Sequence, residues 1–222
     1  MLIKEFCAEN MTLVPAAVAC GAQRIELCDN LAVGGTTPSY GVIKSAVAFA
    51  REHDVKVMAM VRPRGGNSVY NEAEAHIMLD DISCARELGV TGVVFGCLRR
   101  SENGCLGIDE ELTKRLVDAA KGSHGAAPLA VTFHMAFDEL DEEEQMGAID
   151  TLSSLGVDRI LTHGGPLSTP ILDNIPHLQK LIDHTCGRIN ILPGGGISWK
   201  NAQRIAALLG VSEVHGSKVV RI

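Results

Sequence analysis

Two cysteines stand at the ends of two short hydrophobic segments near the N-terminus. Cys7 ends the segment Ile3–Cys7, and Cys28 ends the segment Arg24–Cys28. If the two segments are neighbouring parallel strands, they lie about 4.8 Å apart, so we expect the two thiols to point inward at matching heights, where they could share a soft ion. A pair of thiolates is a ligand set that suits Cu(I). The alternative is that both cysteines are inert, because free cysteine commonly packs as a small hydrophobic residue.

A turn that combines two arginines with two glycines follows the hydrophobic segment Val55–Arg62. Arg62 and Arg64 lie on either side of a proline and precede the glycine pair. Two guanidinium groups beside a permissive backbone can clamp a carboxylate or phosphate. The alternative is that the arginines form ion pairs and the glycines serve only the turn.

A run of three glycines forms a second candidate anion site. Gly194, Gly195 and Gly196 precede Ser198, which can cap a following helix. Backbone N–H groups that are exposed at the start of a helix bind phosphate or carboxylate. It is equally consistent with the sequence that these glycines are needed only for the geometry of the turn.

Three further residues could carry out acid–base chemistry. Glu26 lies within the segment that ends at Cys28, and His134 ends the hydrophobic segment Leu129–His134. Both side chains can move protons when they are buried near a substrate, and Asp138 could orient the imidazole. The alternative for His134 is a hydrogen-bonded histidine of the core.

The composition excludes several classes of function. The formal net charge is −7 and only 4% of the residues are aromatic, which disfavours binding to nucleic acids. The apolar runs are too short to cross a bilayer, and the first residues lack the hydrophobic region of a signal peptide. Seven scattered cysteines without a C-x-x-C pair indicate reduced thiols. We therefore expect a cytoplasmic protein without nucleic-acid or membrane partners.

These residues must be positioned by regular elements, and the chain alternates short strand-like segments with helical patterns. Such alternation is typical of parallel βαβ units, and eight of them form a (β/α)8 TIM barrel. We predict one α/β domain of this kind over residues 1–222. The expected strands are Ile3–Cys7, Arg24–Cys28, Val55–Arg62, Gly92–Phe95, Leu129–His134, Arg159–Thr162, Arg188–Leu192 and Ser212–His215.

A repeated glycine supports the closed barrel. Gly21, Gly89, Gly156 and Gly210 each end a predicted helix and lead into an even-numbered strand. Only seven residues follow His215, too few for a complete eighth helix. The eighth helix is therefore expected to be short or absent, and a neighbouring subunit could cover the gap in a homo-oligomer.

Side chains alternate along a strand, so each predicted strand has an inward face that can be read from the sequence. Ionisable groups cost several kcal/mol to bury unpaired, so those on the inward face must pair, as Arg24 can with Glu5, or bind a ligand. The residues predicted to point inward include Glu5, Cys7, Arg24, Glu26, Cys28, Met58, Met60, Arg62, Thr132, His134, Glu213 and His215.

Seven segments that carry these residues resemble the CutC copper homeostasis family, and together they span almost the whole chain. The resemblance implies a (β/α)8 barrel, a cytoplasmic location, oligomers and a role in copper handling. It also implies that Cys7 and Cys28 are the Cu(I) ligands. The segments are Arg24–Cys28, Gly34–Ser39, Arg62–Gly66, Val131–His134 with Ala136–Asp138, Arg159–Thr162, Pro193–Gly196 and Val214–His215.

Two positions depart from the family pattern. Met135 stands where the family usually has arginine, and His163 stands where it usually has serine. These changes add soft side chains and remove a cation from the expected site. The leading hypothesis is a Cu(I)-handling protein, and the alternative is an isomerase-like or lyase-like enzyme acting on a small phosphorylated or carboxylated substrate. In that alternative the two arginines and the glycine run hold the anion, and Glu26 or His134 moves a proton. A non-catalytic binding barrel is also compatible with the fold.

Overall fold

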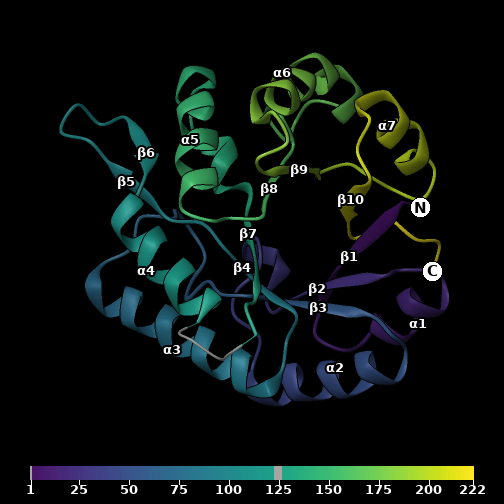
Figure 1. Ribbon diagram of the computed structural model, residues 1–222. Coiled ribbons are helices and arrows are strands. Elements are labelled where there is room, and N and C mark those ends of the chain that lie inside the picture. The colour runs from purple at the N-terminus through teal and green to yellow at the C-terminus, as the bar shows by residue number, and fades with distance from the viewer. Residues whose placement is uncertain (1, 123–126) are drawn as a thin grey trace.

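The protein is a (β/α)8 barrel in which eight parallel strands surround a common lumen (Figure 1). A computed structural model describes residues 2–122 and 127–222. Each of the eight predicted strands is present, with ends that differ by a few residues, so the predicted fold class is confirmed. The strands are β1 (Ile3–Glu9), β2 (Arg24–Cys28), β3 (Lys56–Met60), β4 (Gly92–Phe95), β7 (Ala130–Phe133), β8 (Arg159–Thr162), β9 (Asn190–Pro193) and β10 (Glu213–Gly216).

The hydrogen-bonded ring of strands has one open joint. The order runs β10-β1-β2-β3-β4-β7-β8-β9, with every neighbouring pair parallel. Strands β9 and β10 lie next to each other, but no backbone ladder joins them in the described part of the chain. We call this joint the seam of the barrel.

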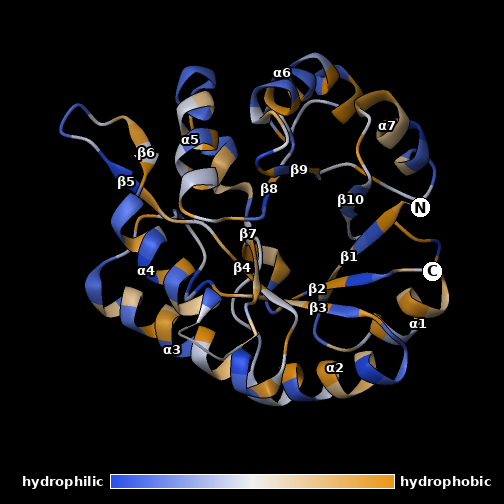
Figure 2. Cartoon of the chain, in the orientation of Figure 1, coloured by the Kyte–Doolittle hydropathy of each residue, from blue (hydrophilic) through white to orange (hydrophobic). Residues whose placement is uncertain are grey.

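Seven α-helices cover the outside of the barrel in the described residues. In Figure 2 they carry both hydrophobic and hydrophilic residues, as expected for amphipathic helices with one face on the sheet. The longest, α3, begins with the capping box of Asn71 and Glu74. The helices are α1 (Val14–Ala19), α2 (Tyr40–Glu52), α3 (Glu72–Leu88), α4 (Glu110–Lys121), α5 (Glu142–Ser154), α6 (Ile175–Thr185) and α7 (Ala202–Leu209).

A short C-terminal segment stands where an eighth helix would be. After β10 the chain continues to Ile222 without a helix, as predicted (Figure 1). Val219 and Val220 are buried, and a β-bridge joins Lys218 to Ser198. The segment therefore closes this side of the core by packing rather than by a helix.

One element was not expected from the sequence. Strands β5 (Leu98–Arg100) and β6 (Leu106–Ile108) pair antiparallel and form a hairpin that projects from the barrel (Figure 1). Each strand has only three residues, which is too short for a period-2 hydrophobic pattern to be recognised.

The alternation of side chains follows the prediction. On the strands, Phe6, Ile25 and Leu27 point outward into the main hydrophobic core beneath the helices. A separate small cluster fills part of the lumen; its buried members are Cys28, Met58, Met60 and Val94.

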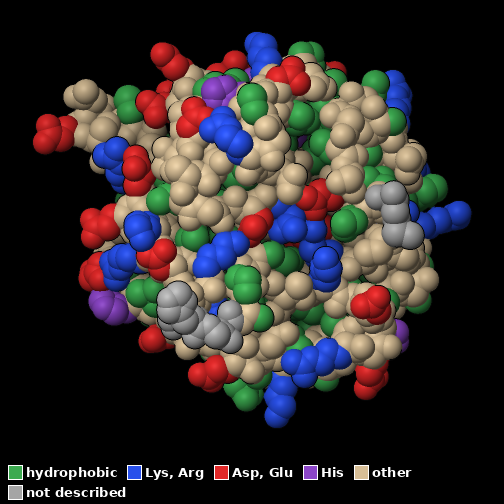
Figure 3. Space-filling model, viewed as in Figure 1, with side chains coloured by type: hydrophobic (Ala, Val, Ile, Leu, Met, Phe, Trp, Pro, Cys, Tyr) green, Lys and Arg blue, Asp and Glu red, His purple; other side chains and the backbone are tan. Residues whose placement is uncertain are grey.

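The surface carries both signs of charge. Figure 3 shows acidic and basic side chains interspersed over one face of the molecule. Among the described residues, no helix combines the length and the apolar composition needed to cross a bilayer.

A buried chain of charges crosses the lumen at the seam. Arg24 bonds to Glu5 on β1, and its NH1 atom lies 2.6 Å from the Glu213 carboxylate on β10. The Nε atom of Arg159 on β8 lies 3.1 Å from the same carboxylate. Arg24 and Glu5 are almost completely buried, and their predicted pairing is confirmed. The four side chains link β8 to β10, β1 and β2 where the backbone ladder is interrupted.

We expect the substitution Arg24→Met to lower the free energy of unfolding by about 3–5 kcal/mol, because it removes the buried guanidinium that pairs with both Glu5 and Glu213. Urea denaturation followed by circular dichroism measures this change. The matched control is Lys114→Met, which breaks an exposed Lys114–Asp118 pair and should cost less than about 1 kcal/mol. Equal effects of the two substitutions would contradict the role assigned to the buried charges.

Candidate metal and ligand site

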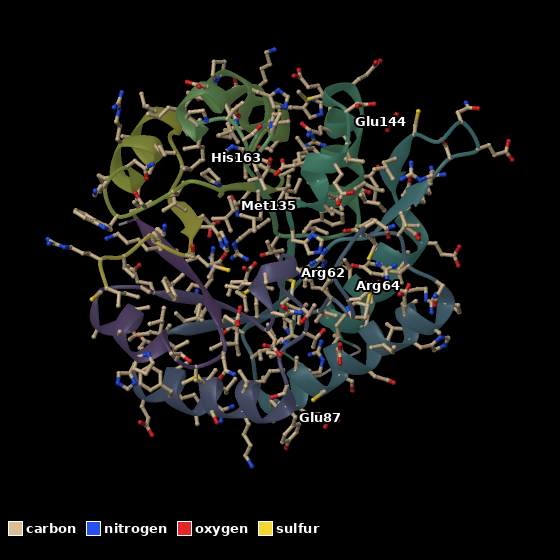
Figure 4. The ribbon with its side chains drawn as sticks, turned by 180° about the vertical axis from the view of Figure 1, so that it is seen from behind. Arg62, Arg64, Glu87, Met135, Glu144 and His163 are labelled. Carbon is tan, nitrogen blue, oxygen red and sulfur yellow. The ribbon has the colours of Figure 1, made fainter. Side chains whose placement is uncertain are left out.

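A cavity of about 290 Å³ opens at the carboxyl ends of the strands. Thiol, carboxyl, imidazole and guanidinium groups from five strands or strand ends meet in its wall, as the alternation of side chains predicted. Figure 4 shows Arg62 and Met135 near the centre of the barrel, viewed from behind. The polar and sulfur-containing residues of the wall are Cys7, Glu26, Met60, Arg62, Ser68, His134, Met135, Glu139 and His215.

Three of these residues form a compact cluster that could hold a metal ion. Cys7 on β1, Glu26 on β2 and His215 on β10 each offer one ligand atom, and these atoms lie within 4.8 Å of one another. The strand register explains the meeting, because Cys7 stands opposite Glu26 in the ladder between β1 and β2. Glu26 and His215 are buried, and Cys7 is half-buried.

Cys28 lies beside this cluster but not at the height of Cys7. It stands opposite Glu9, one inward position farther along β2 than Glu26, so the expectation of matching heights is corrected by the register. Its thiol lies 3.7 Å from the Glu26 carboxylate and is completely buried. The loop at Gly35 covers it, since a Cβ atom there would lie 3.3 Å from the sulfur.

The imidazole of His215 is held by a carboxylate on its far side. Its Nδ1 atom lies 2.8 Å from Oε1 of Glu5, and its Nε2 atom lies 3.6 Å from Oε2 of Glu26. A carboxylate that accepts from one ring nitrogen and leaves the other for a metal is a common arrangement at metal sites. His215 was predicted to point inward but was not selected as a ligand; the same alternation that selected Cys7 applies to it.

The titration behaviour of the cluster reflects these contacts. A hydrogen bond with Cys28 outweighs burial and lowers the pKa of Cys7 well below its ordinary value, and His215 adds to the effect. Burial raises the pKa of Glu26 well above its ordinary value. Burial alone would lower the pKa of His215, but Glu26, Cys7 and Glu5 together raise it. Cys7 is therefore the thiol best suited to react or to bind a metal as thiolate.

Arg62 forms another part of the cavity wall and also fastens two loops. Its NH1 atom donates to the carbonyl oxygens of Val33 at 2.8 Å and Gly35 at 2.9 Å, and its NH2 atom donates to that of Gly66 at 2.7 Å. The loops after β2 and β3 are thereby tied together across the cavity mouth.

His134, at the end of β7, faces Arg62 across the cavity. Its Nδ1 atom accepts a hydrogen bond of 3.1 Å from the backbone N–H of Ala136, which caps the 3-10 helix η2 (Met135–Glu139). Burial and the positive charge of Arg62 lower the pKa of His134 to about 3. The imidazole is therefore neutral at physiological pH.

Two sequence-predicted residues are engaged elsewhere. Arg64 lies outside the cavity wall and forms an ion pair of 2.5 Å with Glu74 at the start of α3; Figure 4 shows it farther from the centre than Arg62. Asp138 accepts from the hydroxyl of Thr162 and, at 2.9 Å, from the backbone N–H of His163. Its partners lie on β8 and the following loop, so it does not orient His134.

The glycine run lies in an adjoining part of the cavity. Gly195 and Gly196 have φ angles of +72° and +78°, which favour glycine, and they line this part together with Ser198. Gly194 donates to the carbonyl of Thr162 at 2.9 Å. A Cβ atom there would lie 2.5 Å from Leu161, so packing as well as backbone conformation requires glycines.

The two residues that depart from the family pattern have different surroundings. Met135 lines both parts of the cavity, next to Cys7 and His215. His163 is buried, with Nδ1 at 2.9 Å from the carbonyl of Gly195 and Nε2 at 3.1 Å from that of Thr169. Its ring nitrogens thus support the glycine loop and are not directed at a ligand.

Comparison with known proteins gives consistent matches over the whole chain. A model of the CutC family matches residues 2–220. A CutC family protein of Enterococcus faecalis is 56% identical over 219 residues, covering 99% of this chain and 100% of that protein. The human protein named copper homeostasis protein cutC homolog is 40% identical, covering 97% of this chain and 72% of the relative. The crystal structure of CutC from Streptococcus agalactiae superimposes with a TM-score of 0.90 at 43% identity, covering 99% and 100% of the two chains.

We expect Asp138→Ala to lower the free energy of unfolding by about 1–3 kcal/mol, because it leaves the Thr162 hydroxyl and the His163 N–H without an acceptor. Asp138→Asn, which keeps one acceptor oxygen, should lose less. Thermal and urea unfolding of both variants measure the difference. If both variants unfold like the parent protein, Asp138 does not hold the loop after β8.

Proposed function

We propose, from the premise that this chain belongs to the CutC family, that it handles copper by binding Cu(I) in the cavity at the carboxyl ends of the strands. The observation that carries the proposal is the meeting of Cys7, Glu26 and His215 within 4.8 Å, beside the thiol of Cys28. In this proposal copper is the cargo of the protein. The name of the human relative, a copper homeostasis protein, agrees with it.

The donor types fit Cu(I) better than a hard cation. Thiolate sulfur and imidazole nitrogen are soft or intermediate ligands, and Cu(I) accepts two or three of them. Cys7 supplies the thiolate, and His215 offers Nε2 because its Nδ1 atom is engaged with Glu5. Cys28 is the second sulfur, one inward position farther along β2. Glu26 is a hard oxygen ligand, and burial disfavours its charged form, so it is the weakest of the four for this ion.

The location and assembly that we propose follow from the same premise. Seven cysteines without a disulfide agree with a reducing compartment such as the cytoplasm. Two large apolar side chains are exposed on the side of the barrel near the C-terminal segment, those of Trp199, which precedes α7, and of Ile222. A second copy packed there would bury them in a homo-oligomer.

We expect Cys7→Ser to weaken Cu(I) binding by about 100-fold or more, because loss of a direct ligand should exceed the 10- to 100-fold typical of outer contacts. Competition with a chromogenic Cu(I) chelator under reducing conditions measures the affinity. Cys105→Ser, at an exposed cysteine of the β5–β6 hairpin, is the matched control and should bind like the parent. Parental affinity in Cys7→Ser would refute the proposal.

Two further variants separate the possible partners of Cys7. If the ion is shared by the two thiols, Cys28→Ser weakens Cu(I) binding and His215→Gln has the smaller effect. If the ion is held by Cys7 and the imidazole, His215→Gln has the larger effect, since His215 offers a ligand atom within 4.8 Å of that of Cys7. X-ray absorption at the copper edge distinguishes two sulfur ligands from one sulfur and one nitrogen.

A further inference from the structure

The side of the cavity formed by the ends of β3 and β7 carries an N–H group with no partner. The backbone N–H of Ala136 donates to Nδ1 of His134, so the proton of the neutral ring must be on Nε2. Nε2 is buried and has no hydrogen-bond partner among the residues that the structure describes. His134 is only 7% exposed and lines the cavity. A buried donor without a partner is costly and calls for an acceptor.

The neighbouring glycine shows that the ring position is built into the fold. Gly96 follows β4, and a Cβ atom there would lie 2.5 Å from Nδ1 of His134. Any larger residue would push the imidazole out of its place. The ring is therefore fixed from two sides, by the N–H of Ala136 and by the space at Gly96.

Arg62 supplies a buried positive charge to the same space. It is 8% exposed, and its terminal nitrogens donate only to neutral carbonyl groups. Its Nε atom has no hydrogen-bond partner in the described chain, and the carboxylate that attracts it, that of Glu139, is exposed. A buried cation is costly, and an anion placed beside it lowers that cost.

We propose that this part of the cavity binds a small organic carboxylate, with an oxygen on Nε2–H of His134 and its negative charge beside the guanidinium of Arg62. The hydroxyl of Ser68 borders the same space, and Met60 and Leu161 form apolar wall for the body of the ligand. The site does not depend on copper: its two donors, His134 and Arg62, follow β7 and β3, whereas the proposed Cu(I) ligands belong to β1, β2 and β10.

The number of donors favours a carboxylate over a phosphate group. One neutral N–H and one guanidinium match the two oxygens of a carboxylate, whereas a phosphate presents three oxygens and more charge. Two carboxyl groups, those of Glu26 and Glu139, also line the cavity, which limits the negative charge that it can accept. Glu139 is exposed at the mouth, where water screens it.

The test uses metal-free full-length protein labelled with 15N-histidine, titrated with acetate, pyruvate and inorganic phosphate in the presence of a copper chelator. We expect acetate and pyruvate to shift the Nε2–H resonance of His134 saturably, and phosphate to leave it unchanged. Isothermal titration calorimetry then measures the affinity of each variant for pyruvate. Because copper is absent throughout, failure of this site and failure of the copper proposal are distinguished.

Two substitutions at His134 separate the two roles of its ring, which are donation from Nε2–H to the ligand and acceptance by Nδ1 from the Ala136 N–H. His134→Asn keeps an oxygen that can accept from Ala136 N–H but loses the donor, and should weaken pyruvate binding by about 10- to 100-fold. His134→Gln places an amide N–H near the position of Nε2 and should recover most of the affinity. His76→Asn, on the exposed face of α3, is the matched control.

Three outcomes would overturn the inference. The first is the absence of a saturable shift with either carboxylate up to the solubility of the probe. The second is parental pyruvate affinity in His134→Asn. The third is a shift with phosphate alone, which would replace the carboxylate by a phosphorylated ligand.

Discussion

The buried charge chain of Glu5, Arg24, Glu213 and Arg159 is the interaction on which the rest of the structure depends. It spans the seam between β9 and β10, where the backbone ladder of the barrel is interrupted. Charges in a low-dielectric interior are stable only when each finds its partner, so the chain fixes the relative positions of the strands that carry it. A hydrophobic lumen at the seam would pack without specifying which strands meet.

The same charge chain also orients the candidate metal site. Glu5 bonds to Arg24 with one carboxylate oxygen and to Nδ1 of His215 with the other. The imidazole is thus turned so that Nε2 faces Cys7 and Glu26. The Glu5 carboxylate therefore both pairs with Arg24 at the seam and orients the imidazole of His215. A substitution at Arg24 would alter the cavity by changing the position of Glu5.

How much of this could be predicted depends on whether a feature is local in the sequence. The strands and the inward positions of Cys7, Glu26 and His134 follow from alternation within a few residues. The heights of Cys7 and Cys28 do not, because the stagger between strands is a property of the closed barrel. The Arg64 side chain points toward Glu74 at the start of α3, and the Asp138 side chain points toward Thr162 on β8. Both contacts join separate elements, so no local pattern in the sequence predicts them. The β5–β6 hairpin is too short to leave a pattern.

The lumen is divided into an apolar sector and a charged sector. The sector of β3 and β4 is filled by Met58, Met60 and Val94, whereas the sector around the seam carries the charges. The thiol of Cys7 and the imidazole of His215 lie at the end of the charged sector, where Glu5 holds the imidazole. The donors for an oxyanion stand across the cavity, above the apolar sector, where His134 and Arg62 find only neutral carbonyl groups and N–H groups of the backbone. The buried carboxylates of Glu5, Glu26 and Glu213 favour a cation on the wall near the seam, whereas the wall of His134 and Arg62 carries only the exposed carboxylate of Glu139.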